Sequence, residues 1–171
     1  MGGVSRVRML LGHGVMLAVG LVALALALTS CFDSPIEGER QALEHAKQAL
    51  EHAQRLIPLL QTQLWEEAYK QTAKVKGELE EAIAQLDQAM KGWARRGQSP
   101  LPSELEALSL LNEVAQSNQS IQDKLSAPEE ITTSIQNRLI ERAKENARAL
   151  ERAVERLKKA IEQRLSGGEQ G

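Results

Sequence analysis

The chain has 171 residues and a formal net charge of -2, with 26% of its residues charged and only 2% aromatic. A nucleic-acid-binding surface needs clustered basic charge, and a base-stacking platform needs aromatic side chains, so this composition argues against both. The residues after position 30 have the length of one domain and are rich in Ala, Leu, Glu, Gln, Lys and Arg, the strong helix formers. We therefore expect an all-α protein that binds no nucleic acid.

The first 30 residues have the layout of an export signal. Arg6 and Arg8 precede an uncharged segment, residues 9–30, which is apolar throughout residues 15–28. A basic start, an apolar core and small residues before the cleavage point are typical of a segment that is removed after export. Because residues 1–30 contain those two arginines and no acidic residue, their removal changes the formal net charge from -2 to -4. We predict a cleaved signal peptide over residues 1–30.

The end of this segment resembles the lipobox of bacterial lipoproteins, since Leu28, Thr29 and Ser30 directly precede Cys31. The resemblance implies that the signal is cut before Cys31, that its sulfur carries a diacylglyceryl thioether, and that the new terminal amine is acylated as well, for example by palmitate. Cys31 is the only cysteine, so it has no disulfide partner within the chain. Two or three acyl chains hold a protein firmly on a membrane. The expected location is extracytoplasmic, lipid-anchored to a bacterial membrane; an uncleaved anchor of about 20 apolar residues is the alternative.

A long helix is predicted over residues 36–93, after a lipidated N-terminus and short linker at residues 31–35. Ser34 is suited to the N-cap and Pro35 to the first helical position. Residues 41–47 recur, with one change, as residues 48–54. This period of seven aligns three adjacent apolar lines: Leu43, Leu50 and Ile57; Ala46, Ala53 and Leu60; Ala42, Ala49 and Leu56. A stripe of this width predicts packing against more than one neighbouring helix.

Pro58 interrupts this pattern, because proline lacks the N–H that a helix interior uses. No Gly, Asn, Asp or Ser lies among residues 55–60 to favour a reversal. We therefore predict a kink at Pro58 and a single helix that continues to Trp93.

The next break is a true turn. Gly97, Pro100 and Pro102 separate two periodic segments, which marks a loop. Ser103 at the N-cap and Glu106 three residues later predict a capping box for a middle helix that ends near residue 125. Asn118 falls on the apolar line of this helix; a buried, register-fixing Asn and a solvated polar patch both fit.

A short break at Ser126 and Pro128, with a further capping box, precedes a last helix predicted over residues 129–165, and residues 166–171 form a flexible tail. The helical domain thus covers residues 36–165. Two architectures of three long helices fit. In one, the kinked first helix pairs with the other two laid end to end, as an elongated antiparallel hairpin. In the other, the segment after Pro58 and the next two helices form an up-down-up bundle above a stalk of residues 36–57.

No catalytic or metal site is predicted. His45 and His52 lie seven residues apart on one helix, roughly 10 Å along its axis, which is too far for both to bind one metal ion. We interpret them as duplicates of one exposed position. No glycine motif for phosphate is present. Trp65, Tyr69 and Trp93 are the residues suited to a pocket, or else they fill the core. We expect no enzymatic activity and no cofactor other than the lipid on Cys31.

Two classes of function remain. The first is a membrane-anchored, non-enzymatic helical scaffold or interaction protein, which binds a protein partner or a second copy of itself. The second is a helical-bundle lipoprotein that binds or senses a small apolar ligand. The lipidated N-terminus, the helical body and residues Leu64-Trp65-Glu66-Glu67 also resemble the PsbQ-type lipoproteins of cyanobacteria, although the longer last helix departs from that pattern. This resemblance implies an accessory subunit of photosystem II on the lumenal side.

Overall fold

The computed structural model describes residues 34–167, which are almost entirely helical. The elements are α2 (Pro35–Gln61), α3 (Trp65–Arg95), α4 (Pro102–Leu125), the 3-10 turn η1 (Pro128–Glu130) and α5 (Thr133–Gly167). No strand occurs within residues 34–167, so the all-α class is confirmed for them. The signal segment, the lipobox and Cys31 lie outside the described residues.

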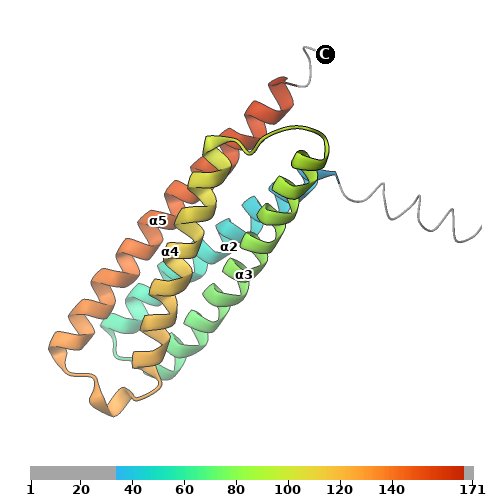
Figure 1. Cartoon of the computed structure of the whole chain (residues 1–171). Coiled ribbons are helices and arrows are strands. Elements are labelled where there is room, and N and C mark those ends of the chain that lie inside the picture. Colours follow the sequence, from blue (N-terminus) through green and yellow to red (C-terminus); the bar gives the residue numbers. More distant parts are fainter. Residues whose placement is uncertain (1–33, 168–171) are drawn as a thin grey trace, which may run out of the picture. The chain divides into compact units, whose positions relative to one another are not determined.

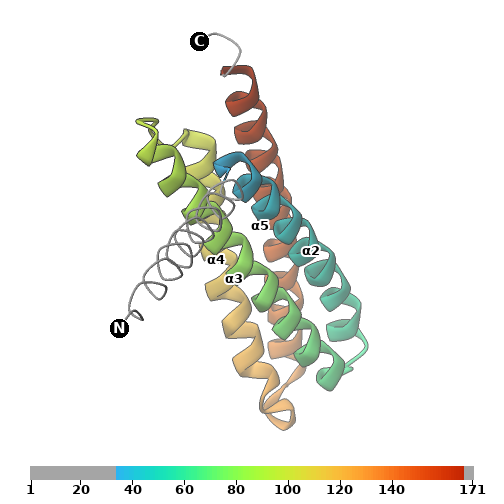
Figure 2. The same cartoon turned by 90° about the vertical axis from the view of Figure 1, so that its right-hand side faces the viewer.

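The long helices form an antiparallel bundle. Each packs against its neighbour in sequence, and α2 also packs against α5, so the first and last helices close the ring (Figure 1, Figure 2). Short connections between consecutive helices favour this up-down-up-down arrangement. The predicted antiparallel helical bundle is therefore confirmed, whereas the prediction of three long helices was wrong, because residues 34–167 contain four. Residues 36–57 are not a stalk, because they belong to α2 and its buried face is covered by α3 and α5.

The predicted first helix is divided at a tight turn after Pro58. α2 ends at Gln61, and Gln63 adopts a left-handed backbone conformation with φ of 58°. The N–H of Leu64 donates to the carbonyl of Leu59 at 3.0 Å, which is the long bond of a Schellman motif. The kink prediction failed because a glutamine occupies the position that glycine or asparagine usually takes in this motif.

The start of α4 lies two residues before its predicted position, with Leu101 instead of Ser103 at the N-cap. The helix begins at Pro102, and the carboxylate of Glu104 accepts a hydrogen bond from the N–H of Leu101 at 2.8 Å. Glu104, and not Glu106, is therefore the residue that caps this helix. Proline at the first helical position explains the shift, since its missing N–H is not needed there.

The start of α5 lies four residues after its predicted position. Residues Pro128–Glu130 form a separate 3-10 turn, and α5 begins at Thr133. The hydroxyl of Thr132 accepts a hydrogen bond from the N–H of Ile135 at 3.4 Å, so Thr132 takes the N-cap role predicted for Ser126. The start of α2 at Pro35 agrees with the prediction.

The core combines small residues from α2 with larger aliphatic residues from the other helices. The apolar lines of the sequence repeat supply the buried face of α2: Ala42, Ala46, Ala49, Ala53, Leu56 and Leu60. Fully buried leucines from the remaining helices fill the interior: Leu79, Leu86, Leu111, Leu150 and Leu157. Small side chains let α2 approach α3 closely, and a Cβ atom added to Gly92 would lie only 2.7 Å from Cγ of Pro35.

Asn118 is buried in this core, with 1% of its surface exposed. Its Nδ2 donates to the carbonyl of Thr72 at 2.9 Å, which links α4 to α3. Its Oδ1 has no hydrogen-bond partner within residues 34–167. Of the two interpretations left open by the sequence, the buried one is therefore correct.

Candidate functional site

An open pocket of about 350 Å³ lies at the end of the bundle where α3 begins and α4 ends. Its lining residues are Trp65, Glu66, Tyr69, Leu125, Ser126 and Pro128. Trp65 and Tyr69 are one helical turn apart on α3, as the sequence indicated, and so they face the same side. We call this the pocket end of the bundle.

The apolar surface at the pocket end is accessible to solvent. Tyr69 is 40% exposed and Leu64 is 47% exposed, so this end holds two of the four large hydrophobic residues that are exposed within residues 34–167. Trp65 is half-buried, because part of its side chain packs against the core cluster that contains Leu60 and Leu125. The core thus fixes the position of Trp65 while the pocket remains open.

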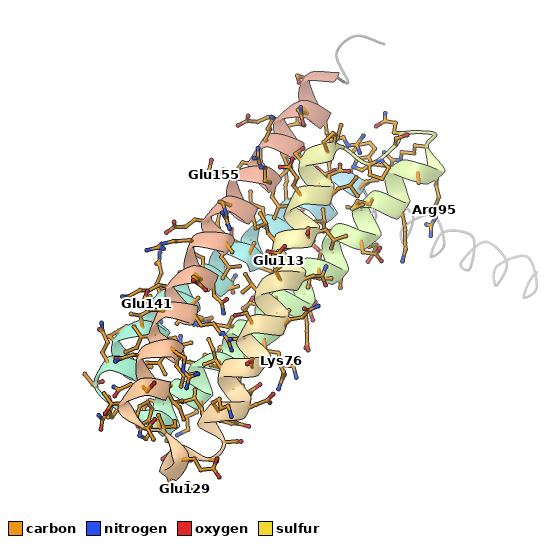
Figure 3. The ribbon with its side chains drawn as sticks, turned by 60° about the vertical axis from the view of Figure 1, so that its left-hand side comes forward. Lys76, Arg95, Glu113, Glu129, Glu141 and Glu155 are labelled. Carbon is orange, nitrogen blue, oxygen red and sulfur yellow. The ribbon has the colours of Figure 1, made fainter. Side chains whose placement is uncertain are left out.

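The turns around the pocket carry mainly acidic side chains. Glu66 forms an ion pair with Lys70 at 2.5 Å. Glu67, Glu129 and Glu130 are exposed, and none of them forms an ion pair with another described residue. Figure 3 shows Glu129 at the tip of the bundle, directed into solvent. The pocket end of the bundle therefore has an excess of negative charge, mainly from Glu129 and Glu130 beside the lining residue Pro128.

Trp93 lies at the other end of the bundle, apart from Trp65 and Tyr69. Its indole Nε1 donates to Oε1 of Glu39. The guanidinium carbon of Arg164 lies 4.6 Å from the centre of its ring and that of Arg96 lies 5.5 Å from it, both within the range of a cation–π interaction. The structure therefore does not gather the three candidate aromatics into one site. We call this second region the Pro35 end, since α2 begins there.

Arg164 is the centre of a buried polar cluster at the Pro35 end. Its Nε and Nη2 lie 2.9 and 2.7 Å from Oε1 of Glu104. Its Nη1 donates to the side chain of Gln98 at 2.9 Å, and Nη2 also donates to the carbonyl of Ser99 at 3.1 Å. Glu39 lies 3.7 Å from Nε. One side chain of α5 is thereby hydrogen-bonded to α4 and to the loop between α3 and α4, and it forms an ion pair with α2.

Glu39 and Glu104 are both fully buried, with one guanidinium between them. Burial raises the pKa of Glu39 to about 7; the hydrogen bond from Trp93 lowers it, the neighbouring carboxylate of Glu104 raises it, and Arg164 lowers it. Oε2 of Glu39 has no hydrogen-bond partner among the described residues. A proton on Glu39 is therefore favoured, because two buried carboxylates otherwise share one positive charge.

The patterns in the sequence did not predict this cluster. Glu39 and Arg164 lie 125 positions apart in the chain, and only the closure of the ring by α2 and α5 brings them together. The single local signal is that Glu104 falls three residues after Leu101, the spacing of a capping carboxylate.

The two histidines of the described chain connect helices. Nδ1 of His45 lies 2.7 Å from Oε2 of Glu78, and Nδ1 of His52 lies 2.8 Å from Nε2 of Gln71. Both pairs join α2 to α3, and both histidines are half-buried. Their interpretation as merely exposed positions was wrong. Within residues 34–167, no group of three or more His, Cys, Asp or Glu side chains is placed to hold a metal ion.

A second, smaller pocket of about 260 Å³ lies between α4 and α5. It is lined by Lys124, Ile135, Arg138, Leu139 and Arg142. Nη1 of Arg142 donates to the hydroxyl of Ser120 at 2.7 Å, which holds one cation against α4. No local pattern predicts this pocket, because its residues come from two helices that only the fold brings together.

No family model, no curated protein and no solved structure matches this chain. None of the helices in residues 34–167 combines the length and the apolar character that a membrane span requires. The features that bear on function are therefore the pocket, the buried cluster and the position of Pro35.

Proposed function

We propose that this protein is an extracytoplasmic lipoprotein that holds a helical bundle on a bacterial membrane and binds a protein partner without catalysing a reaction. The observation that carries the proposal is the short distance in sequence between Cys31 and Pro35, where α2 begins. Four residues of extended chain span at most about 14 Å. A lipid on Cys31 would therefore keep the Pro35 end close to the membrane surface, and the pocket end would face away from it.

The filled interior of the bundle favours a function in partner binding, because it leaves little space for an enclosed ligand. Fully buried leucines such as Leu79, Leu111 and Leu150 occupy the space between the helices. Both pockets described above open at the surface instead of lying inside the bundle. A rigid scaffold with an exposed contact surface fits these features, and an accessory subunit of a membrane complex is one form of this function.

The anchor is tested by replacing the lipidated cysteine. We expect the wild-type chain in the membrane fraction, with a mass increase equal to the attached lipid, and the Cys31→Ser variant without that lipid. Ser30→Ala is the matched control, since a small residue before the cysteine keeps the lipobox pattern and lipidation should persist. Membrane retention of Cys31→Ser as a mature chain, or a wild-type protein without lipid, would contradict the proposed anchor.

The partner is tested by crosslinking in intact cells, followed by mass spectrometry of the proteins attached to the tagged lipoprotein. A defined protein that crosslinks to the wild type and is lost with Cys31→Ser would support an anchored interaction role. Crosslinks between copies of the chain alone would indicate a self-assembling spacer. The absence of any crosslinked protein would favour the alternative ligand-binding function.

A further inference from the structure

We infer that the pocket formed by Trp65, Tyr69, Leu125 and Pro128 is the docking site for a protein segment in which a large apolar side chain stands next to Lys or Arg. The inference rests on the part of the proposed function that concerns partner binding. It does not depend on the lipid anchor.

The size and lining of the pocket fit one or two large apolar side chains. Its volume of about 350 Å³ is at the lower end of the range for binding pockets, roughly 300–1,000 Å³. Trp and Tyr are the residue types most enriched among the residues that dominate binding energy at protein interfaces. Only 2% of this chain is aromatic, yet two aromatics lie side by side in one open pocket.

The polar groups of these aromatics are not used by the fold. The indole N–H of Trp65 and the hydroxyl of Tyr69 form no hydrogen bond with any residue in the described part of the chain. Trp93 differs, since its N–H is bonded to Glu39 and two guanidinium groups lie over its ring. Trp and Tyr at interfaces typically bury an apolar body and keep a polar group for hydrogen bonding. Trp65 and Tyr69 have both capacities available.

The charge around the pocket selects a basic partner. Glu129 and Glu130 directly follow the lining residue Pro128, and they are exposed without an ion pair within residues 34–167. The cations nearby are Lys70, which is paired with Glu66, and Lys124, which lines the other pocket. Complementary charge steers association and suppresses wrong partners, so an acidic segment would be disfavoured here.

The experiment is a selection of random peptides displayed on phage against the full chain in detergent micelles, repeated with Tyr69→Ala and with Trp65→Ala. We expect enriched peptides that contain a large apolar residue beside Lys or Arg. Synthetic copies of these peptides should bind at least about tenfold more weakly to either variant. Tyr69→Ala keeps the test valid if Trp65→Ala fails to fold, because Tyr69 is 40% exposed.

The role of charge is tested with the double variant Glu129→Lys/Glu130→Lys. Its affinity for the same peptides should fall by about threefold or more at low ionic strength. Two controls are matched to these changes. Glu113→Lys alters an exposed acidic residue in the middle of α4 (Figure 3), and Leu105→Ala removes a 51% exposed leucine near the start of α4. Neither control should change binding.

Three outcomes would overturn the inference: a consensus rich in Asp or Glu, equal binding to the wild type and Tyr69→Ala, or Tyr69-dependent association only between copies of the chain. The full chain carrying Cys31→Ser should select the same peptides. Failure of the docking site is therefore distinguishable from failure of the lipid anchor, since the second would leave the peptide consensus unchanged.

Discussion

Tryptophan has opposite roles at the two ends of the bundle. At the Pro35 end, Trp93 has its N–H bonded to Glu39 and its ring covered by Arg164 and Arg96. At the pocket end, Trp65 and Tyr69 line an open pocket and make no hydrogen bond through their side chains within residues 34–167. The first end uses its aromatic to join helices, whereas the second presents aromatics to solvent.

The difference has a thermodynamic consequence. Among the described residues, Arg164 is the one cation beside two buried carboxylates, so the loss of Arg164 leaves an uncompensated buried negative charge. The pocket end has no such dependence, because its acidic residues are exposed to water. Substitutions at the Pro35 end should therefore change stability, and substitutions at the pocket end should change binding.

The largest effect is expected for Arg164→Ala. This change leaves Glu39 and Glu104 buried without a cation, and the free energy of unfolding should fall by about 3–5 kcal/mol. Arg156→Ala is the control, because Arg156 forms an exposed ion pair with Glu106 at 2.6 Å, and its loss should cost less than about 1 kcal/mol. Urea unfolding followed by circular dichroism measures both values. Equal effects of the two substitutions would show that the buried cluster does not hold the Pro35 end together.

The second prediction concerns the dependence of stability on pH. Because burial raises the pKa of Glu39 from 4.5 to about 7, the folded state keeps a proton that the unfolded state releases between these values. The stabilisation from this proton is complete below pH 4.5 and is lost as the pH rises through about 7. The free energy of unfolding should fall by on the order of 2 kcal/mol across this window.

Glu39→Gln removes the titrating group and should abolish that fall. The measurement is urea unfolding at a series of pH values. Glu78→Gln is the control, since it makes the same change at a glutamate that contacts His45 on α2. A wild-type curve and a Glu39→Gln curve that run parallel from pH 4.5 to pH 7 would show that Glu39 does not titrate in the folded state as proposed.

The third prediction compares two glycines of α3. A Cβ atom at Gly92 would lie 2.7 Å from Cγ of Pro35, so Gly92→Ala should force the helices apart and cost about 1–3 kcal/mol. A Cβ atom at Gly77 would meet no other atom within 4 Å, so Gly77→Ala should stabilise by roughly 0.5–1 kcal/mol through helix propensity. Thermal unfolding of both variants tests the sign of each change. Two stabilising substitutions would indicate that the close packing at the Pro35 end is not required.

The sequence predicted those features that depend on local patterns. The period of seven identified the buried face of α2, from Ala42 to Leu60, because helical periodicity is set by the residues themselves. The turn after α3 was predicted because Gly97, with φ of 76°, is the usual residue for a left-handed position. The turn at Gln63 uses the same backbone geometry without a glycine, so no local signal revealed it.

For the candidate site as well, the prediction was correct only for the residues whose spacing along one helix decides their position. Trp65 and Tyr69 were placed one turn apart by spacing alone, and the structure shows both in one pocket. Trp93 was grouped with them only because all three are aromatic, and it lies near the opposite end of α3, Trp65–Arg95, so the length of that helix places it at the other end of the bundle. The opposite wall of the pocket comes from Leu125 and Pro128, which only the pairing of α3 with α4 brings near Trp65.

The smallest effect on stability is expected for Tyr69→Ala, and this substitution tests the comparison most directly. Tyr69 is 40% exposed, and its side chain forms no hydrogen bond within the described residues. Alanine is the better helix former, so the free energy of unfolding should change by less than about 0.5 kcal/mol. Thermal unfolding measures this change, and Trp93→Ala should in contrast cost about 3 kcal/mol or more. A loss above about 2 kcal/mol for Tyr69→Ala would mean that the pocket end also serves the fold. Unchanged stability combined with lost peptide binding would separate the two ends by role, because only a contact surface can lose its ligand and leave the bundle intact.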